Sequence, residues 1–298
     1  MINNKLKKKL EKKEFVFTAE TSPPDSTEIV DITERISCLK NLADAINVTD
    51  GASAKSHLSS LVVSSIVQSF GIEAIMQITT RDRNRIAIQS DLLGAWTLNI
   101  KNILCIYGDQ VHTGDQPETK EVRDLDTLEI AKTADYFKKE KKFPSGRLIK
   151  SAPDFFIGGA DTPYDIDDKF DCKNLEKKIN AGVNFFQTQY AFDFLTLNKY
   201  MNRLNDYGIP EKSFYLIGLG VIKTAKSAKW MNKNLYGINI PENIIKRIEN
   251  SKNQEEEGKK ICIELIEQYK GIKGIHGVHL MGYHQEQQIA EVIKYFKN

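Results

Sequence analysis

The stretch from Asn102 to Asp126, NILCIYGDQVHTGDQPETKEVRDLD, guides the interpretation of the whole chain. Its apolar run Ile103–Ile106 predicts a short buried strand that ends in Tyr107-Gly108-Asp109, and a long polar loop follows. A strand that delivers a glycine and an acid into such a loop is typical of a ligand site in an α/β protein. Gly108 lets a ligand approach the backbone, and Asp109 lies at the carboxyl end of the strand. A plain turn with a helix-capping or salt-bridging Asp109 fits this stretch equally well.

The same strand-then-helix unit recurs along the chain. β-branched and aromatic runs predict eight strands, at residues 15–19, 45–49, 74–79, 103–106, 155–159, 184–188, 213–217 and 277–281. Amphipathic helix patterns separate them, and an extra helix at 241–250 comes before the last strand. Eight such units predict an α/β fold of the (β/α)₈ TIM-barrel type, for which about 250 residues is typical. A doubly wound open sheet is the alternative, but the chain has neither a G-x-G-x-x-G after the first strand nor a P-loop.

The 298 residues are interpreted as a single barrel domain, residues 1–298, with a basic helical extension at 1–13. Between Lys5 and Lys13 only Leu6 and Leu10 are apolar. Their i, i+4 spacing predicts a solvated amphipathic helix, which is far too polar for the apolar core of a signal peptide.

Composition excludes several classes of partner and site. The formal net charge of +2 is near balance, which argues against nucleic acid, and no apolar run is long enough to span a bilayer. The cysteines are far apart and form no C-x-x-C pair, so we expect reduced thiols in a cytoplasmic protein: Cys38, Cys105, Cys172 and Cys262. No cluster of His, Asp and Glu indicates a metal site, and each histidine is interpreted as structural or solvated.

In a barrel of this type, catalytic residues come from the carboxyl ends of the strands. Glu20 is the sharpest candidate there, because Pro23 and Pro24 would wall it from solvent. Partial desolvation favours the protonated form of a carboxyl group, as general acid catalysis requires. The alternative for Glu20, as for Asp109, is a salt bridge to a lysine or arginine.

Two further polar groups have an open interpretation. The segment Thr80–Arg85, TRDRNR, is either a plain helix start capped by Asp82 or a set of arginines aimed at a phosphate-bearing cofactor. Asp171, Asn174 and Lys178 lie on one predicted helix. From their spacing alone, we interpret them as part of a solvent-exposed helix face rather than as residues that bind a cofactor.

Taken in order, the motifs at the strand ends resemble those of the methylenetetrahydrofolate reductase family, a family of flavin-containing barrels. The resemblance runs from about Phe15 to Phe296 and rests on six segments: TAETSPP at 18–24, VTDGA at 48–52, QITTRDRNR at 77–85, YGD at 107–109, AGV at 181–183 and TQYAFD at 188–193. The RDRNR segment and the loop after Asp109 are more similar to a bacterial subgroup found in acetogenic or methyl-group-using anaerobes.

The resemblance implies reduction of 5,10-methylenetetrahydrofolate to 5-methyltetrahydrofolate, or the reverse oxidation, in one-carbon metabolism. It implies that Glu20 is the general acid and that Asp109 lies between the flavin and the folate. Gln189 would orient the folate. The expected cofactor is FAD, with FMN as the alternative, and the residues expected to contact it are Thr49, Gln77, Gly108, Asp109, Asp171, Asn174 and Lys178.

The chain departs from the family pattern on the flavin side. Gln77 stands where the family often has His, Tyr107 where it often has Arg, and Ala160 near a common Tyr; Gln110-Val111 replaces a common Pro-Pro. The electron donor is therefore open: NADH, NADPH, ferredoxin or a partner protein. The alternative function is a folate- or flavin-binding barrel subunit that needs an electron-transfer or corrinoid methyl-transfer partner. A homo-oligomer is a further candidate assembly, and the loop through His112 and Gly114 is expected to cover the cofactor.

Overall fold

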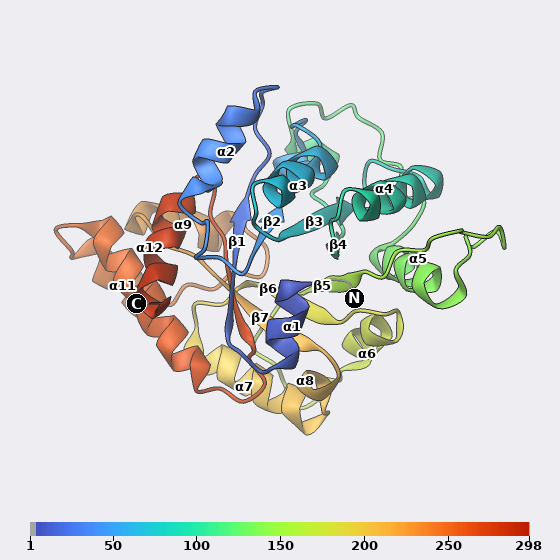
Figure 1. Ribbon diagram of the computed structural model, residues 1–298. Helices are drawn as coiled ribbons and strands as arrows, with labels where there is room; N and C mark the ends of the chain where they lie inside the picture. Colours follow the sequence, from blue (N-terminus) through green and yellow to red (C-terminus); the bar gives the residue numbers. More distant parts are fainter. Residues whose placement is uncertain (1–3, 298) are drawn as a thin grey trace.

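The computed structural model describes residues 4–297 and shows eight parallel strands closed into a barrel (Figure 1). The strands pair in chain order, and β8 closes on β1 with Val16 opposite Gly277. Their bounds are β1 Val16–Thr21, β2 Ala45–Val48, β3 Ala74–Thr79, β4 Asn102–Ile106, β5 Phe156–Asp161, β6 Phe185–Tyr190, β7 Phe214–Leu219 and β8 Gly277–Leu280. The predicted (β/α)₈ barrel is confirmed, and the open doubly wound sheet is wrong.

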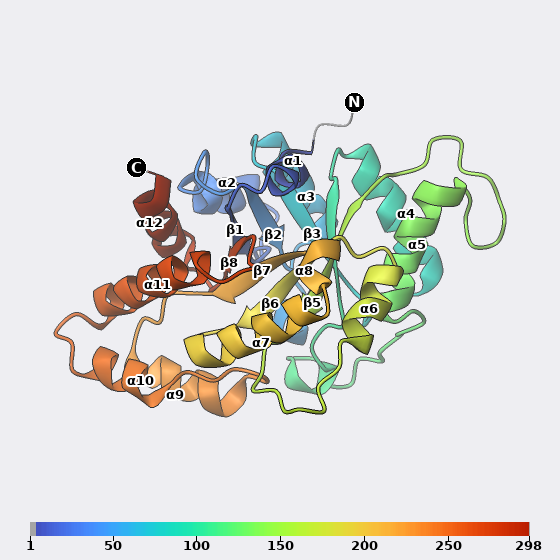
Figure 2. The same ribbon diagram turned by 90° about the horizontal axis from the view of Figure 1, so that it is seen from below.

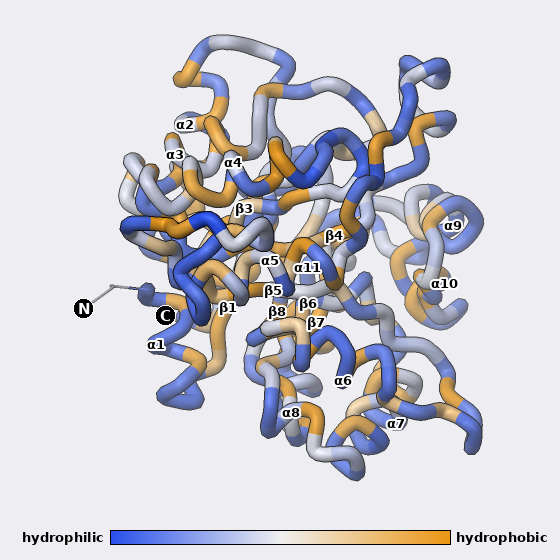
Figure 3. The backbone as a smooth tube through the Cα atoms, turned by 90° about the vertical axis from the view of Figure 1, so that its right-hand side faces the viewer, coloured by the Kyte–Doolittle hydropathy of each residue, from blue (hydrophilic) through white to orange (hydrophobic). Residues whose placement is uncertain are grey.

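Helices alternate with the strands and form the outer ring, apart from the first helix, which closes one end of the barrel. They are α1 Lys5–Glu11, α2 Ile29–Ser37, α3 Ser60–Ser69, α4 Arg85–Thr97, α5 Thr127–Glu140, α6 Lys173–Asn180, α7 Phe194–Asp206, α8 Ile209–Lys212, α9 Ala225–Asn234, α10 Glu242–Glu249, α11 Gln254–Lys270 and α12 Glu286–Lys297, with 3₁₀ turns η1 Ala52–Ala54 and η2 Val111–Thr113. The extra helix predicted before the last strand is α10. Figure 3 shows the apolar strand segments in the middle of the molecule, where the side chains of strands and helices pack together.

The N-terminal end of the barrel is filled by apolar side chains and closed by α1, which lies at the opposite end from α9 and α10 (Figure 2). Leu6 and Leu10 are fully buried there, so the helix predicted to be solvated is instead the plug of the barrel floor. They pack on inward-facing strand residues: Val16, Ala45, Ile75, Leu104, Phe156, Phe185 and Leu216. Burial of each leucine contributes about 1.5–3 kcal/mol.

The buried carboxylate of Glu73 fixes the start of α1. It accepts hydrogen bonds from the backbone N–H of Lys5 at 2.7 Å and from the amide of Asn102 at 2.9 Å. The side-chain amide of Asn4 also donates to Asn102, at 2.7 Å. Burial raises the pKa of Glu73, against these hydrogen bonds, which lower it.

All four cysteines are free thiols. Cys105, Cys172 and Cys262 are buried and Cys38 is partly buried, as expected from their positions in strand and helix patterns. In the part of the chain that the structure describes, no helix has the length and apolar character needed to cross a membrane.

Candidate active site

Glu20 lies on the inward face of β1, at the carboxyl end of the barrel. Its side chain is 21% exposed and faces two other inward residues. Gln77, at the end of β3, donates its amide N–H to Glu20 Oε2 at 3.4 Å. Nε2 of His279, on β8, lies 3.7 Å from the same oxygen. The contacts of Glu20 are thus an amide and an imidazole, and not the lysine or arginine of the alternative interpretation.

Below Glu20, inward-facing polar side chains form a hydrogen-bonded layer across the barrel. Nδ1 of His279 lies 3.0 Å from the Thr18 hydroxyl, which accepts a hydrogen bond from Gln187 at 3.1 Å. Gln187 and Asn47 exchange two amide hydrogen bonds, of 2.6 and 3.0 Å. All four side chains are buried, and the layer connects β1, β2, β6 and β8. Because each member has partners, the layer holds the His279 ring in place under Glu20 without leaving a polar group unpaired.

The sequence analysis missed this layer and treated His279 as an ordinary structural residue. A signal was present in the alternation of the strands, because inward positions recur every second residue. Thr18 comes two residues before Glu20, and Asn47, Gln187 and His279 are polar residues at inward positions of their own strands. Polar residues at inward positions of several strands predict an interior polar layer.

Thr49 directly follows β2, and Gly108 lies just beyond β4; both are at the carboxyl end of the barrel. The Thr49 hydroxyl is buried and has no hydrogen-bond partner, so a polar ligand atom would satisfy it. Gly108 has φ +81°, and a Cβ there would approach Thr79 Cγ2 to 3.0 Å, so glycine is required. Between the ends of β4 and β5, a cavity of about 150 Å³ is lined by Tyr107, Ala160 and Lys178 among others. The unpartnered Thr49 hydroxyl and the close backbone approach that Gly108 allows suit a bound cofactor, while the cavity between β4 and β5 is lined by neither of these two residues.

Asp109 lies just beyond β4 and is tied to the loop after β2. Its carboxylate accepts the backbone N–H of Ser53 at 2.7 Å, and its carbonyl accepts from Arg81 at 3.2 Å. The loop that follows Asp109 packs with Gly114 against the backbone of Ala54. The loop after β4, which is expected to cover a cofactor, therefore packs against η1. Asp109 joins this loop to the loop after β2 at the mouth of the barrel.

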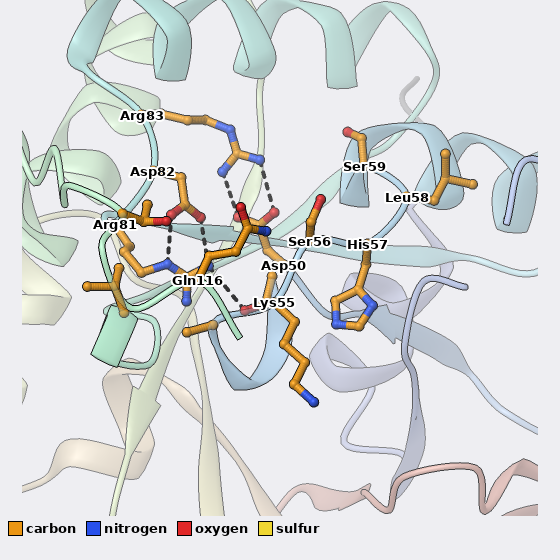
Figure 4. A pocket seen from close by; sticks show the side chains of 14 residues that line it. Asp50, Lys55, Ser56, His57, Leu58, Ser59, Arg81, Asp82, Arg83 and Gln116 are labelled. Atoms are coloured by element: carbon orange, nitrogen blue, oxygen red, sulfur yellow. Dashed lines mark hydrogen bonds and ion pairs between the residues drawn. The ribbon is translucent and has the colours of Figure 1, made fainter. Parts of the chain in front are cut away.

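The three arginines of the TRDRNR segment all have acidic partners. Arg81 pairs with Asp82, Arg83 makes two hydrogen bonds to Asp50, and Arg85 pairs with Asp124. Figure 4 shows the first two pairs facing a cavity of about 400 Å³. The helix cap is Asn84, whose side chain accepts the N–H groups of the first turn of α4. The segment is a helix start, as one interpretation had it, but its cap is Asn84 and not Asp82; each of the three arginines has a carboxylate partner.

Gln189 lies at the end of β6, where the strand register shifts between Gln187 and Tyr190. Its side-chain oxygen accepts the N–H of Tyr190 at 2.9 Å, and its amide donates to the carbonyl of Tyr236 at 3.4 Å. The segment after α9 thus reaches over the rim to Gln189. Tyr236 itself is 89% exposed.

The three residues on or before α6 lie apart from Glu20. Asp171 is exposed and pairs with Lys173, and Asn174 is exposed. Lys178 reaches the end of β5, where it donates to the carbonyl of Ala160 at 2.6 Å. Burial lowers the pKa of Lys178, while the nearby Asp161 raises it. Of the three, only Lys178 reaches the cavity between β4 and β5.

Comparison with known proteins places the chain in a family. The family model described as methylenetetrahydrofolate reductase matches residues 5–297. The chain belongs to the methylenetetrahydrofolate reductase family. A Caenorhabditis elegans relative, a probable methylenetetrahydrofolate reductase (NADPH), is 24% identical over 243 residues, which are 79% of this chain and 34% of the relative. The chain therefore spans about one third of the length of that protein.

Two solved structures share the barrel at low identity. An uncharacterized protein from Clostridium thermocellum, which binds two copies of 5-methyl-5,6,7,8-tetrahydrofolic acid, has a TM-score of 0.65 and 13% identity, covering 98% of this chain and 99% of its own. An F420-dependent secondary alcohol dehydrogenase in complex with an F420-acetone adduct has a TM-score of 0.58 and 13% identity, covering 95% and 99%. At this identity both comparisons support the fold alone.

Proposed function

We propose that the protein is a flavin-dependent methylenetetrahydrofolate reductase that interconverts 5,10-methylenetetrahydrofolate and 5-methyltetrahydrofolate. The observation that carries the proposal is Glu20, a partly exposed carboxyl group held by Gln77 and His279 inside the mouth of a barrel that matches this family along its length. The methyltetrahydrofolate bound by the Clostridium thermocellum protein of the same fold supports a folate substrate.

Glu20 is the general acid in this proposal. Its proton goes to a nitrogen of the bridging ring of the folate, the bond from that nitrogen to the methylene carbon breaks, and an electrophilic iminium forms. Gln77 and His279 hold the carboxyl group in place, and no lysine or arginine among the described residues pairs with it.

Asp109 and Gln189 hold the folate in this proposal. Asp109 is fixed by the N–H of Ser53 and keeps further lone pairs for the donor groups of a pterin ring. Gln189 stands across the mouth, where its amide contacts the segment at Tyr236. Thr49, Gly108 and Lys178 are the residues that best fit an FAD, and Gln77, Asp171 and Asn174 stay predicted contacts. When bound, the flavin supplies the hydride that turns the iminium carbon into a methyl group.

The test is a half-reaction that needs no natural electron donor. The purified protein is loaded with FAD, reduced chemically without oxygen and mixed with methylenetetrahydrofolate, and the return of the oxidised flavin spectrum is followed. Wild type should reoxidise with formation of methyltetrahydrofolate. Glu20→Gln should bind FAD normally and reoxidise about 10²–10⁴-fold more slowly. Glu34→Gln, on the exposed face of α2, is the matched control and should match wild type.

Two results would overturn the proposal: a protein that takes up no flavin, or a reduced flavin that methylenetetrahydrofolate leaves reduced. Full activity in Glu20→Gln would remove Glu20 from the reaction while leaving the activity in place. Repeating the wild-type measurement with NADH or NADPH as the reductant then separates an enzyme that uses pyridine nucleotides from one that needs an electron-transfer partner.

A further inference from the structure

Arg81 is a buried arginine at the barrel mouth whose hydrogen bonds join two separate loops. It is only 3% exposed. Its Nε and Nη2 bind Asp82 at 2.7 Å each, Nη2 also donates to the carbonyl of Gly51 at 3.1 Å, and Nη1 donates to the carbonyl of Asp109 at 3.2 Å. Figure 4 shows the guanidinium group beside Asp82 at the wall of the cavity. One planar group thus reaches the loop after β2 and the loop after β4 at the same time.

The loop after β2 is shaped to receive this guanidinium group. Gly51 has φ +58°, and a Cβ at that position would lie 2.2 Å from Arg81 Nη2. Ser53 and Ala54 follow with φ 58° and 53°, a conformation that residues with side chains rarely adopt. The turn that they form aims the N–H of Ser53 at the carboxylate of Asp109. Arg81 therefore holds the backbone of Asp109, and the turn next to Gly51 holds its side chain.

We propose that Arg81 is a positioning residue for Asp109: it fixes the carboxylate at the barrel mouth by tying the loop at 51–54 to the loop that begins at Asp109. The inference rests on the proposed function, in which Asp109 meets the folate. Asp82 is the counter-ion that lets Arg81 remain charged while buried, and the hydrogen bond to Asp82 is the main cause that raises the pKa of Arg81.

The neighbouring arginines of the same segment do not share this role. Arg83 binds the side chains of Asp50, at the start of the loop after β2, and of Asp91 on α4, and in the hydrogen bonds that the described residues make it donates neither to residues 51–54 nor to Asp109. Arg85 is exposed and pairs with Asp124 at the start of α5. Arg85 therefore provides a matched control for the loss of an arginine from this segment.

The test is a double-mutant cycle on the full chain. Arg81→Met and Asp109→Ala are made singly and together, and kcat and KM for methylenetetrahydrofolate are measured beside Arg85→Met. If Arg81 acts through Asp109, each single variant loses activity by at least about tenfold, and the double variant loses no more than Asp109→Ala alone. Arg85→Met should match wild type. Losses that multiply in the double variant would overturn the inference, as would full activity in Arg81→Met.

A second measurement needs no turnover. Hydrogen exchange is followed in wild type, Arg81→Lys and Arg81→Met, with Arg85→Met as the control. The amide of Ser53 and the loop from Asp109 to Gly114 should exchange faster in both Arg81 variants, because lysine has no fork to reach two carbonyl groups. Unchanged exchange would overturn the inference. If wild type shows no folate reaction but the loops loosen as expected, the proposed function fails while the anchoring by Arg81 stands; Arg81→Lys serves if Arg81→Met does not fold.

Discussion

Replacing Asp50 with asparagine tests how the carboxyl end of the barrel is held together. Asp50 follows β2 and is 7% exposed. Its two oxygens accept hydrogen bonds from the guanidinium of Arg83 at 2.6 and 2.9 Å, from the N–H and hydroxyl of Thr79 at 2.9 and 3.0 Å, and from the Ser60 hydroxyl at 3.0 Å. In Asp50→Asn, one oxygen becomes an NH₂ group that faces donors, and Arg83 loses the closer of its two carboxylate partners, keeping Asp91.

The expected cost is about 3–5 kcal/mol, the range for removing one partner of a buried ion pair. The pH dependence has a definite sign. Burial raises the pKa of Asp50, but the hydrogen bonds and charge of Arg83, with the donors on Thr79, outweigh it and lower the pKa below its ordinary 3.8. A lowered pKa contributes stability above the unfolded-state value and loses it as pH falls through the folded-state value. The gap between wild type and Asp50→Asn should therefore be constant at neutral pH and shrink below about pH 3.8.

Urea unfolding followed by circular dichroism measures this gap, with unchanged m-values as the check that both proteins unfold alike. Asp124→Asn is the control, because it removes the acid that pairs with the exposed Arg85 of the same segment and should change the unfolding midpoint little. A loss below about 1 kcal/mol for Asp50→Asn, the range of surface ion pairs, would refute the reasoning. A gap that widened in acid would refute the assigned sign.

Two more predictions concern the two ends of the barrel. Leu10→Ala should lower the free energy of unfolding by about 2–5 kcal/mol, because it leaves a cavity in the barrel floor, and should leave kcat/KM unchanged at the far end; a thermal melt and an activity assay check both. His279→Leu should lower kcat with flavin binding intact, because it removes the imidazole next to Glu20; an unchanged kcat would leave that 3.7 Å contact without a role in the reaction.

Local patterns were enough to predict the barrel, because each strand and helix shows its own period in the sequence. The same patterns could not place α1. A pair such as Leu6 and Leu10, spaced i, i+4, looks alike on a solvated helix and on one that covers apolar surface. The surface it covers exists only after strands from the whole chain, among them β1 and β7, have closed around Phe156 and Phe185. The helix at the N-terminus was therefore predicted correctly, but the apolar surface that it covers was not.

At the candidate site, too, local features could be predicted from the sequence and contacts between remote residues could not. The position of Glu20 and Asp109 at the mouth could be predicted, because strand ends are visible in the sequence. Their partners were missed because the contacts are remote: Thr18 and His279 are 261 residues apart in the chain. The ion pairs of the RDRNR segment were missed for a related reason, since the sequence does not show which acids its arginines contact. Arg83 finds its partner in Asp50, 33 residues earlier.

The two ends of the barrel interior have different roles: the N-terminal end stabilises the fold, and the carboxyl end carries the proposed catalytic group. The floor is filled by apolar side chains and plugged by α1, whose start is held by the hydrogen-bonded side chains of Asn4, Glu73 and Asn102. The next layer is polar, yet Asn47 and Gln187 satisfy each other and Gln187 also supports Thr18. A layer with its hydrogen bonds satisfied can remain buried at little cost and still present His279 upward. Glu20 is then held by Gln77 and His279, with its open side to the mouth. A lysine or arginine in that layer could form an ion pair with Glu20. Such a pair would favour the ionised carboxylate, so Glu20 could no longer donate the proton that the proposed reaction requires.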